Sequence, residues 1–119
     1  MRLGAFDCEI KKDTLAYGIY TKYGIGKNLK NGNLLVSERH RHRFEFNNEF
    51  RKDLEAKGMV FSGTSPDDFF VEVIELPKKV HPFFLATQAH PEYKSSPINP
   101  HPFFLEFVLA SEKFKRKNH

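Results

Sequence analysis

The most regular part of this sequence is Leu34-Leu35-Val36-Ser37-Glu38-Arg39-His40-Arg41-His42-Arg43-Phe44-Glu45-Phe46. Its residues alternate with the period of a β-strand, in which successive side chains point to opposite faces. One face carries Val36, Glu38, His40, His42, Phe44 and Phe46, and the other carries Ser37, Arg39, Arg41, Arg43 and Glu45. We therefore predict a strand with a row of arginines along one side.

Further elements are predicted on both sides of this strand. Arg2 to Ile10 is typical of a short strand, and the polar, glycine-rich stretch from Tyr17 to Asn33 is typical of a loop or hairpin. After the long strand we expect a helix capped by Asn48 and ended by Gly58, strands at 59–62 and 69–76, a short buried strand at 83–88, and a helix from Pro102.

Length and composition indicate one modest globular domain. The chain has 119 residues, of which 39% are hydrophobic and 29% charged, which excludes a disordered chain. Four of the 19 basic residues lie at 113–117, and without them 15 basic residues balance 15 acidic ones. We therefore divide the chain into a folded unit, 1–112, and a basic C-terminal tail, 113–119, and expect no nucleic-acid partner.

The cysteine count and the length of the apolar runs indicate the cell compartment in which the protein is found. The single cysteine, Cys8, excludes an internal disulfide framework and is compatible with a reducing cytosol. Even the longest apolar runs, such as Phe83 to Ala86, are far too short to cross a bilayer. We expect a cytoplasmic protein without a membrane partner.

The segment Thr87-Gln88-Ala89-His90-Pro91-Glu92-Tyr93 carries the strongest chemical signal. His90 and Glu92 are two residues apart, so in an extended segment their side chains point to the same side. A carboxylate beside an imidazole fixes the ring tautomer and stabilises the protonated ring, as a general base requires. The plain alternative is a surface His and Glu at the end of a strand.

A general base needs a nucleophile to activate, and this sequence offers no obvious one. No Gly-x-Ser-x-Gly or Gly-x-Cys-x-Gly elbow occurs in it. Cys8 lies between acidic neighbours that disfavour its thiolate, and a packed structural cysteine is the expected role.

The arginine-rich strand allows two further interpretations. Arg39, Arg41 and Arg43 could grip a carboxylate or phosphate through forked hydrogen bonds. His40 and His42 could instead belong to a metal site of a His-rich β-barrel, completed by Glu45, His81 or His90. Histidines at that spacing arise readily by chance, so we assign no metal ligand.

Six motifs resemble the C-terminal half of the glutaminase domain of the CTP synthase family. They are Met1-Arg2-Leu3-Gly4, Glu38-Arg39-His40-Arg41-His42-Arg43-Phe44-Glu45, Phe61-Ser62-Gly63-Thr64-Ser65-Pro66-Asp67, Val71-Glu72-Val73-Ile74-Glu75-Leu76-Pro77, Gln88-Ala89-His90-Pro91-Glu92 and His101-Pro102-Phe103-Phe104. They occur in the family's order and cover nearly the whole chain. Ala89 departs from the pattern, since the family usually has an aromatic residue there.

The resemblance implies a fold and three site residues. The fold would be α/β, a partial class I glutaminase-type layered sheet of mixed strands flanked by helices, lacking the N-terminal half of the domain. His90 and Glu92 would be the second and third members of a Cys-His-Glu triad, and Arg43 would contact the substrate glutamine. The nucleophile would lie outside this chain.

The resemblance also implies an activity. The family hydrolyses glutamine through a thioester and passes the ammonia to a synthetase domain, where UTP is phosphorylated by MgATP and aminated to CTP, with GTP as activator. The implied partners are glutamine, the remainder of the glutaminase domain, the synthetase domain and further copies in a homo-oligomer. This chain would bind no cofactor and would be inactive alone. A non-catalytic remnant or regulatory fragment of the same fold is the alternative.

Overall fold

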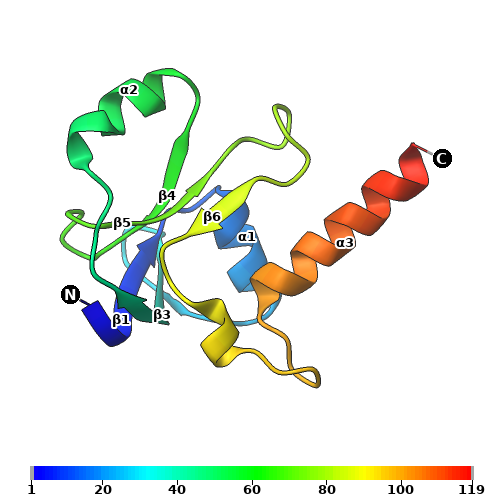
Figure 1. Ribbon diagram of the computed structural model, residues 1–119, viewed down its shortest axis with the longest axis horizontal. Coiled ribbons are helices and arrows are strands. Elements are labelled where there is room, and N and C mark those ends of the chain that lie inside the picture. Colours follow the sequence, from blue (N-terminus) through cyan, green and yellow to red (C-terminus); the bar gives the residue numbers. More distant parts are fainter. Residues whose placement is uncertain (1, 119) are drawn as a thin grey trace.

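The computed structural model describes residues 2–118 as one sheet with helices around it (Figure 1). The strands are β1 (Arg2–Ile10), β2 (Lys27–Asn28), β3 (Leu34–His42), β4 (Val60–Thr64), β5 (Val71–Glu75) and β6 (Leu85–Thr87). The helices are α1 (Leu15–Lys22), α2 (Arg51–Ala56) and α3 (Pro102–Lys117), and the 3₁₀ turns are η1 (Asn48–Phe50) and η2 (Pro91–Lys94). The predicted folded unit, 1–112, and the predicted tail, 113–119, include Met1 and His119, which lie outside the described residues.

The six strands form one open sheet in the order β2-β3-β1-β4-β5-β6. The longest pairing joins β1 to β3, from Arg2 opposite His42 to Ile10 opposite Leu34. All five pairings are antiparallel, so residues 2–118 contain none of the parallel pairs expected of a mixed sheet. The predicted α/β class is confirmed.

The alternation of β3 between two faces is also confirmed. Val36, Glu38 and His40 are buried, while Ser37 and Arg39 are exposed. The core lies between the inner face of the sheet and the helices. It comprises Cys8, Ile10, Leu34, Val36 and Val73 from the strands, Ala16, Ile19 and Tyr20 from α1, and Phe103 from α3.

The prediction of a loop at Tyr17 to Asn33 was wrong in its first part, because helix α1 occupies Leu15–Lys22. Thr14 caps this helix, since its hydroxyl oxygen accepts from the Tyr17 amide at 3.2 Å. The carboxylate of Glu75 accepts from the amides of Leu15 and Ala16, at 2.6 and 3.1 Å. The tertiary cap and the buried apolar face therefore stabilise α1, although the polar residues and the glycine of this segment favour a loop.

The helix predicted after the long strand exists, but its cap is one residue earlier. Asn47 rather than Asn48 is the N-cap, and its side-chain oxygen accepts from the Glu49 amide at 3.0 Å. The turn η1 then leads into α2, which ends before Gly58. Gly58 adopts a φ of 103°, a conformation that favours glycine after a helix.

Two predictions about the C-terminal third need correction. The strand expected at 83–88 is only Leu85–Thr87, and it is half-buried rather than buried because it lies at the sheet edge beside β5 alone. The segment expected to be a basic tail is helical up to Lys117. Three of its four cations, Lys115, Arg116 and Lys117, lie in the last turn of α3, where they interact favourably with the helix dipole. None of the helices at 2–118 has the length and apolar character needed to cross a bilayer.

The buried carboxylate of Glu38 joins β3 to both α1 and α3. One of its oxygens accepts from the Tyr20 hydroxyl at 2.6 Å and lies 2.7 Å from Nε2 of His101, the N-cap of α3. Burial raises the pKa of this carboxyl, but the hydrogen bonds from His101 and Tyr20 and the charge of His101 outweigh burial, so the pKa lies below its ordinary value of 4.5.

We predict opposite stability changes for two glycine substitutions. A Cβ at Gly63 would lie 2.8 Å from Val73 Cγ2 and 3.0 Å from Ile10 Cδ1, so Gly63→Ala should lower the free energy of unfolding by about 1–3 kcal/mol. Gly18, inside α1, has no heavy atom within 4 Å of an added Cβ, so Gly18→Ala should raise that free energy by up to about 1 kcal/mol. Urea unfolding measures both, and a stabilised Gly63→Ala chain would contradict the packing described for β4.

We also predict that acid destabilises the fold partly through Glu38. Because its folded pKa is lowered, its contribution is present above about pH 4.5 and is lost as the pH falls through the folded pKa. Urea unfolding between pH 3 and 7 should therefore show a shallower acid loss for Glu38→Gln. Glu72 has a pKa shifted in the same direction, so part of the loss should remain. Identical pH profiles for the two chains would rule out this role.

Candidate functional site

His90 and Glu92 lie together, as their spacing predicted. His90 Nδ1 is 2.7 Å from Glu92 Oε2, and the two side chains are 33% and 54% exposed. The hydrogen bond from His90 holds the pKa of the Glu92 carboxyl below its ordinary value. With Nδ1–H donating to the carboxylate, Nε2 of the neutral ring keeps the lone pair that a general base needs.

Three backbone and side-chain contacts hold this segment against the sheet. The His90 amide donates to the Arg39 carbonyl at 2.8 Å, and the Gln88 amide donates to the Glu72 carbonyl at 2.8 Å. The side-chain amide of Gln88 donates to the Phe44 carbonyl at 3.1 Å. The residues before Glu92 are therefore tied to β5, to β3 and to the segment after β3.

Tyr93 is a site residue that the sequence analysis missed. Its ring stacks on His90, with ring centres 5.3 Å apart and planes 17° from parallel. A hydrogen bond with the Tyr93 hydroxyl raises the pKa of the Arg41 guanidinium. The available signal was spacing, because Tyr93 follows His90 by three residues and η2 brings such residues together.

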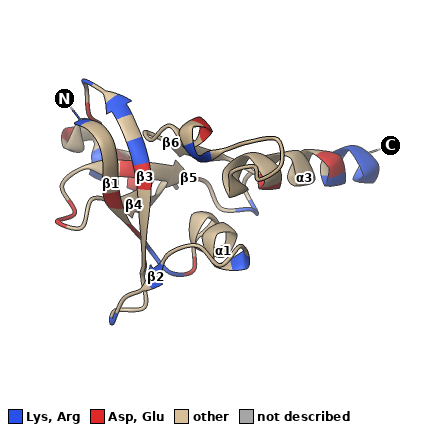
Figure 2. Cartoon of the chain, turned by 90° about the horizontal axis from the view of Figure 1, so that it is seen from below, with Lys and Arg blue, Asp and Glu red and all other residues tan. Residues whose placement is uncertain are grey.

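Arg43 lines a hollow of about 640 Å³ next to this pair. The other lining residues are Arg2, Leu3, Arg39, Arg41, His42 and Tyr93. Tyr93, which stacks on His90, thus forms part of the wall of the hollow. Figure 2 shows basic residues along the end of β3, at the opposite side of the molecule from the basic end of α3.

The arginines of this hollow differ in their partners. Within residues 2–118, ion pairs join Arg2 to Glu45 and Glu72, and none joins Arg39, Arg41 or Arg43 to a carboxylate. The hollow therefore presents uncompensated guanidinium groups beside a histidine base, an arrangement that suits a substrate with a carboxylate.

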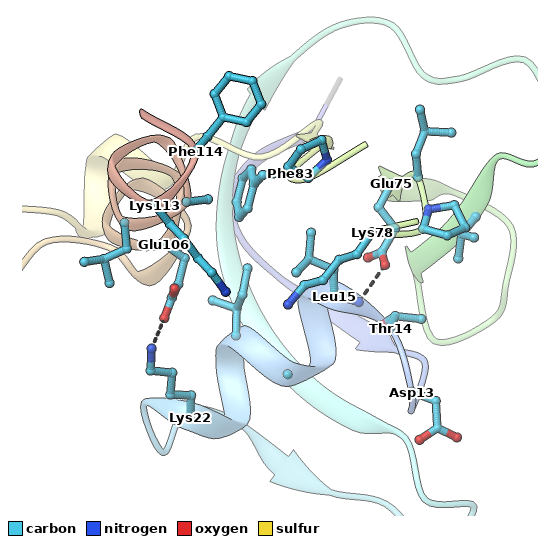
Figure 3. Close-up of a pocket in the computed structure, with 18 of the residues that line it drawn as sticks. Asp13, Thr14, Leu15, Lys22, Glu75, Lys78, Phe83, Glu106, Lys113 and Phe114 are labelled. Carbon is cyan, nitrogen blue, oxygen red and sulfur yellow. Dashed lines mark hydrogen bonds and ion pairs between the residues drawn. The ribbon is translucent and has the colours of Figure 1, made fainter. Parts of the chain in front are cut away.

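A larger groove of about 1030 Å³ lies between α1, α3 and the segment after β5 (Figure 3). Lys22 pairs with Glu106 across it at 2.5 Å, and Phe83 and Phe114 line it. Its lining includes neither His90, Glu92 nor Arg43. Because the groove holds no base-and-carboxylate pair of this kind, the smaller hollow is the candidate site.

Cys8 is placed where it cannot act as a nucleophile. Its side chain is 2% exposed within the core. Burial, together with the charges of Glu72 and Glu38, raises the pKa of its thiol well above the ordinary value. A thiol held in this state is inert.

His40 and His42 contact each other rather than forming a metal centre with the other predicted ligands. Their rings approach at 2.9 Å, and Glu45 Oε2 lies 3.4 Å from His42 Nδ1. His90 pairs with Glu92 instead. No group of three or more His, Cys, Asp or Glu side chains within the described part of the chain is arranged to hold a metal ion.

The profile of the class-I glutamine amidotransferase family matches residues 9–110. The chain belongs to this family. Among its relatives are CTP synthases from Aquifex aeolicus, 53% identical over 98% of the chain, and from Pelotomaculum thermopropionicum, 51% identical over the whole chain. The predicted resemblance to CTP synthase is therefore confirmed. The chain spans 20% of the length of each of these relatives.

A solved structure supports the same assignment. The structure titled Trypanosoma brucei CTPS glutaminase domain with bound acivicin matches with a TM-score of 0.78 and 36% identity. The match covers 95% of this chain and 40% of that one. The fold described above is therefore that of part of such a glutaminase domain.

We predict that the Cys8 thiol of the folded chain does not react with iodoacetamide at pH 8, because burial excludes the reagent and disfavours the thiolate. The urea-unfolded chain should react fully in the same time, as followed by mass spectrometry. A matched control moves the thiol to an exposed position of β3 in the double variant Cys8→Ala, Ser37→Cys, which should react when folded. Rapid labelling of native Cys8 would make it a nucleophile candidate again.

Proposed function

We propose that this chain is the C-terminal part of the glutaminase domain of a CTP synthase, in which His90 is the general base and Glu92 orients it. The observation that carries the proposal is the 2.7 Å contact between His90 and Glu92, beside a hollow in which Arg39, Arg41 and Arg43 have no carboxylate partner among the described residues. The similarity to CTP synthases supports the choice of reaction.

In the proposed reaction, Nε2 of His90 takes the proton of a cysteine thiol that another part of the glutaminase domain supplies. The thiolate adds to the side-chain amide carbon of glutamine, and protonated His90 returns the proton to the departing ammonia. His90 then takes a proton from water, which attacks the thioester, and passes that proton to the cysteine sulfur as glutamate forms. Glu92 holds the ring by Nδ1 throughout, which keeps Nε2 toward the reacting atoms.

Arg43 is proposed to bind the substrate. The planar guanidinium forms two parallel hydrogen bonds with a carboxylate, and free glutamine carries one. Arg43 is exposed in the hollow that Tyr93 also lines, and Tyr93 stacks on His90. A glutamine held there by its carboxylate would extend its side-chain amide toward His90.

The ammonia is proposed to serve the amination of UTP to CTP, driven by MgATP in a synthetase domain and promoted by GTP. The partners are then the remainder of the glutaminase domain, the synthetase domain and other copies of the enzyme. No cofactor is proposed for the residues described here.

The proposal predicts that this chain can replace its counterpart in a working enzyme. We would exchange it for the corresponding segment of Aquifex aeolicus CTP synthase, to which it is 53% identical, and assay glutamate and CTP. The chimera should form both. His90→Ala should lower the kcat for glutamate formation on the order of a millionfold, and Glu92→Gln on the order of ten-thousandfold.

Three controls sharpen this experiment. Arg43→Ala should mainly raise the KM for glutamine, by roughly 10- to 100-fold, because a charge-assisted hydrogen bond is lost. His81→Ala removes an exposed histidine outside the site and should change nothing. The chain alone should release no more glutamate than its His90→Ala variant. A folded chimera without glutaminase activity would favour a non-catalytic remnant or regulatory fragment.

A further inference from the structure

A chain of hydrogen bonds links β3, the segment after it, the segment before His90 and β5. His40 Nδ1 is 2.9 Å from His42 Nε2, and His42 Nδ1 is 2.9 Å from the Phe44 carbonyl oxygen. That oxygen also accepts from the Gln88 side chain at 3.1 Å, and the Gln88 amide donates to the Glu72 carbonyl at 2.8 Å. Glu72 Oε2 also lies 3.1 Å from His40 Nε2, but the two atoms are not aligned as a hydrogen bond.

The contact with Phe44 fixes the tautomer of His42. The Phe44 carbonyl can only accept a hydrogen bond, so His42 Nδ1 carries the N–H that it donates. His42 Nε2 then faces His40 Nδ1 at 2.9 Å.

Charged groups pack beside the two histidines. Arg2 of β1 binds Glu45 through two hydrogen bonds of 2.8 Å and also binds Glu72. Glu45 additionally lies 3.4 Å from His42. Arg2 thus joins the segment after β3 to β5.

We infer that His42 is a positioning residue that fixes Arg43 relative to His90. Arg43 lies between His42 and Phe44 in the sequence, and the Phe44 carbonyl is held from one side by His42 and from the other by Gln88. Gln88 precedes His90 by two residues. These two hydrogen bonds therefore set the separation of the two groups that a bound glutamine must span. The identity of that ligand rests on the function proposed above.

The first test measures the His42 tautomer and needs no activity. In the ¹⁵N-histidine-labelled chain, long-range ¹H–¹⁵N spectra at pH 7 should show N–H at His42 Nδ1. Exposed His81 supplies the reference signal of an independent ring. A His42 ring that carries its proton on Nε2 alone would overturn the hydrogen bond to Phe44.

The second test uses the chimeric CTP synthase. His42→Ala should raise the KM for glutamine on the order of tenfold and change kcat by less than about threefold, because an error in position weakens binding of the substrate more than the chemistry. His42→Asn can still donate to the Phe44 carbonyl and should recover part of the loss. His81→Ala is the matched histidine control.

The outcomes separate this inference from the proposed function. If the unmodified chimera has no glutaminase activity, the proposed function fails, and the spectra alone decide whether His42 donates to the Phe44 carbonyl. If the chimera is active and His42→Ala lowers kcat at unchanged KM, the positioning role is wrong. Equal effects of His42→Ala and His42→Asn would show that the hydrogen bond to Phe44 does not matter.

Discussion

Three buried carboxylates hold this structure together, because a carboxylate removed from water must be paired with donors. Glu38 contacts Tyr20 of α1 and His101, the cap of α3. Glu72 contacts Arg2 of β1 and His40 of β3, and Glu75 caps the start of α1. Each carboxylate thus has partners on at least one other element, and its removal would leave buried donors unpaired. Pairing of charges, as well as apolar packing, fixes how strands and helices meet.

This constraint explains where the candidate site lies. The alternation of β3 directs Glu38 and His40 inward to the paired charges and directs Arg39 and Arg41 outward. Glu72 serves both sides, since its side chain belongs to the buried cluster while its carbonyl accepts from the amide of Gln88. Glu72 therefore connects the buried cluster of charges directly to the segment that carries His90. The site itself remains open to solvent.

The sequence predicted what depends on local period and spacing. The two faces of β3 followed from alternation, and the start of α3 followed from Pro102. The proximity of His90 to Glu92 was predicted for an extended segment, whereas a 3₁₀ turn at Pro91–Lys94 brings the two side chains together. Helix α1 was missed because its capping depends on Glu75, some 60 positions away. The contact between Arg2 and Glu72 was missed for the same reason. Propensity and spacing carry no information about such distant partners, so these tertiary contacts could not be predicted from the sequence.

His90 and Glu92 are already oriented toward each other, but their exposure limits the strength of the interaction. Glu92 is 54% exposed, so water and salt screen its interaction with His90, although the 2.7 Å contact already fixes the ring. Covering the two side chains with another segment would lower the local dielectric constant and strengthen the interaction without moving either group. The contact is thus oriented in advance, while its strength would depend on such a cover. Because the arginines nearby are equally open, the same covering would strengthen their attraction for a carboxylate.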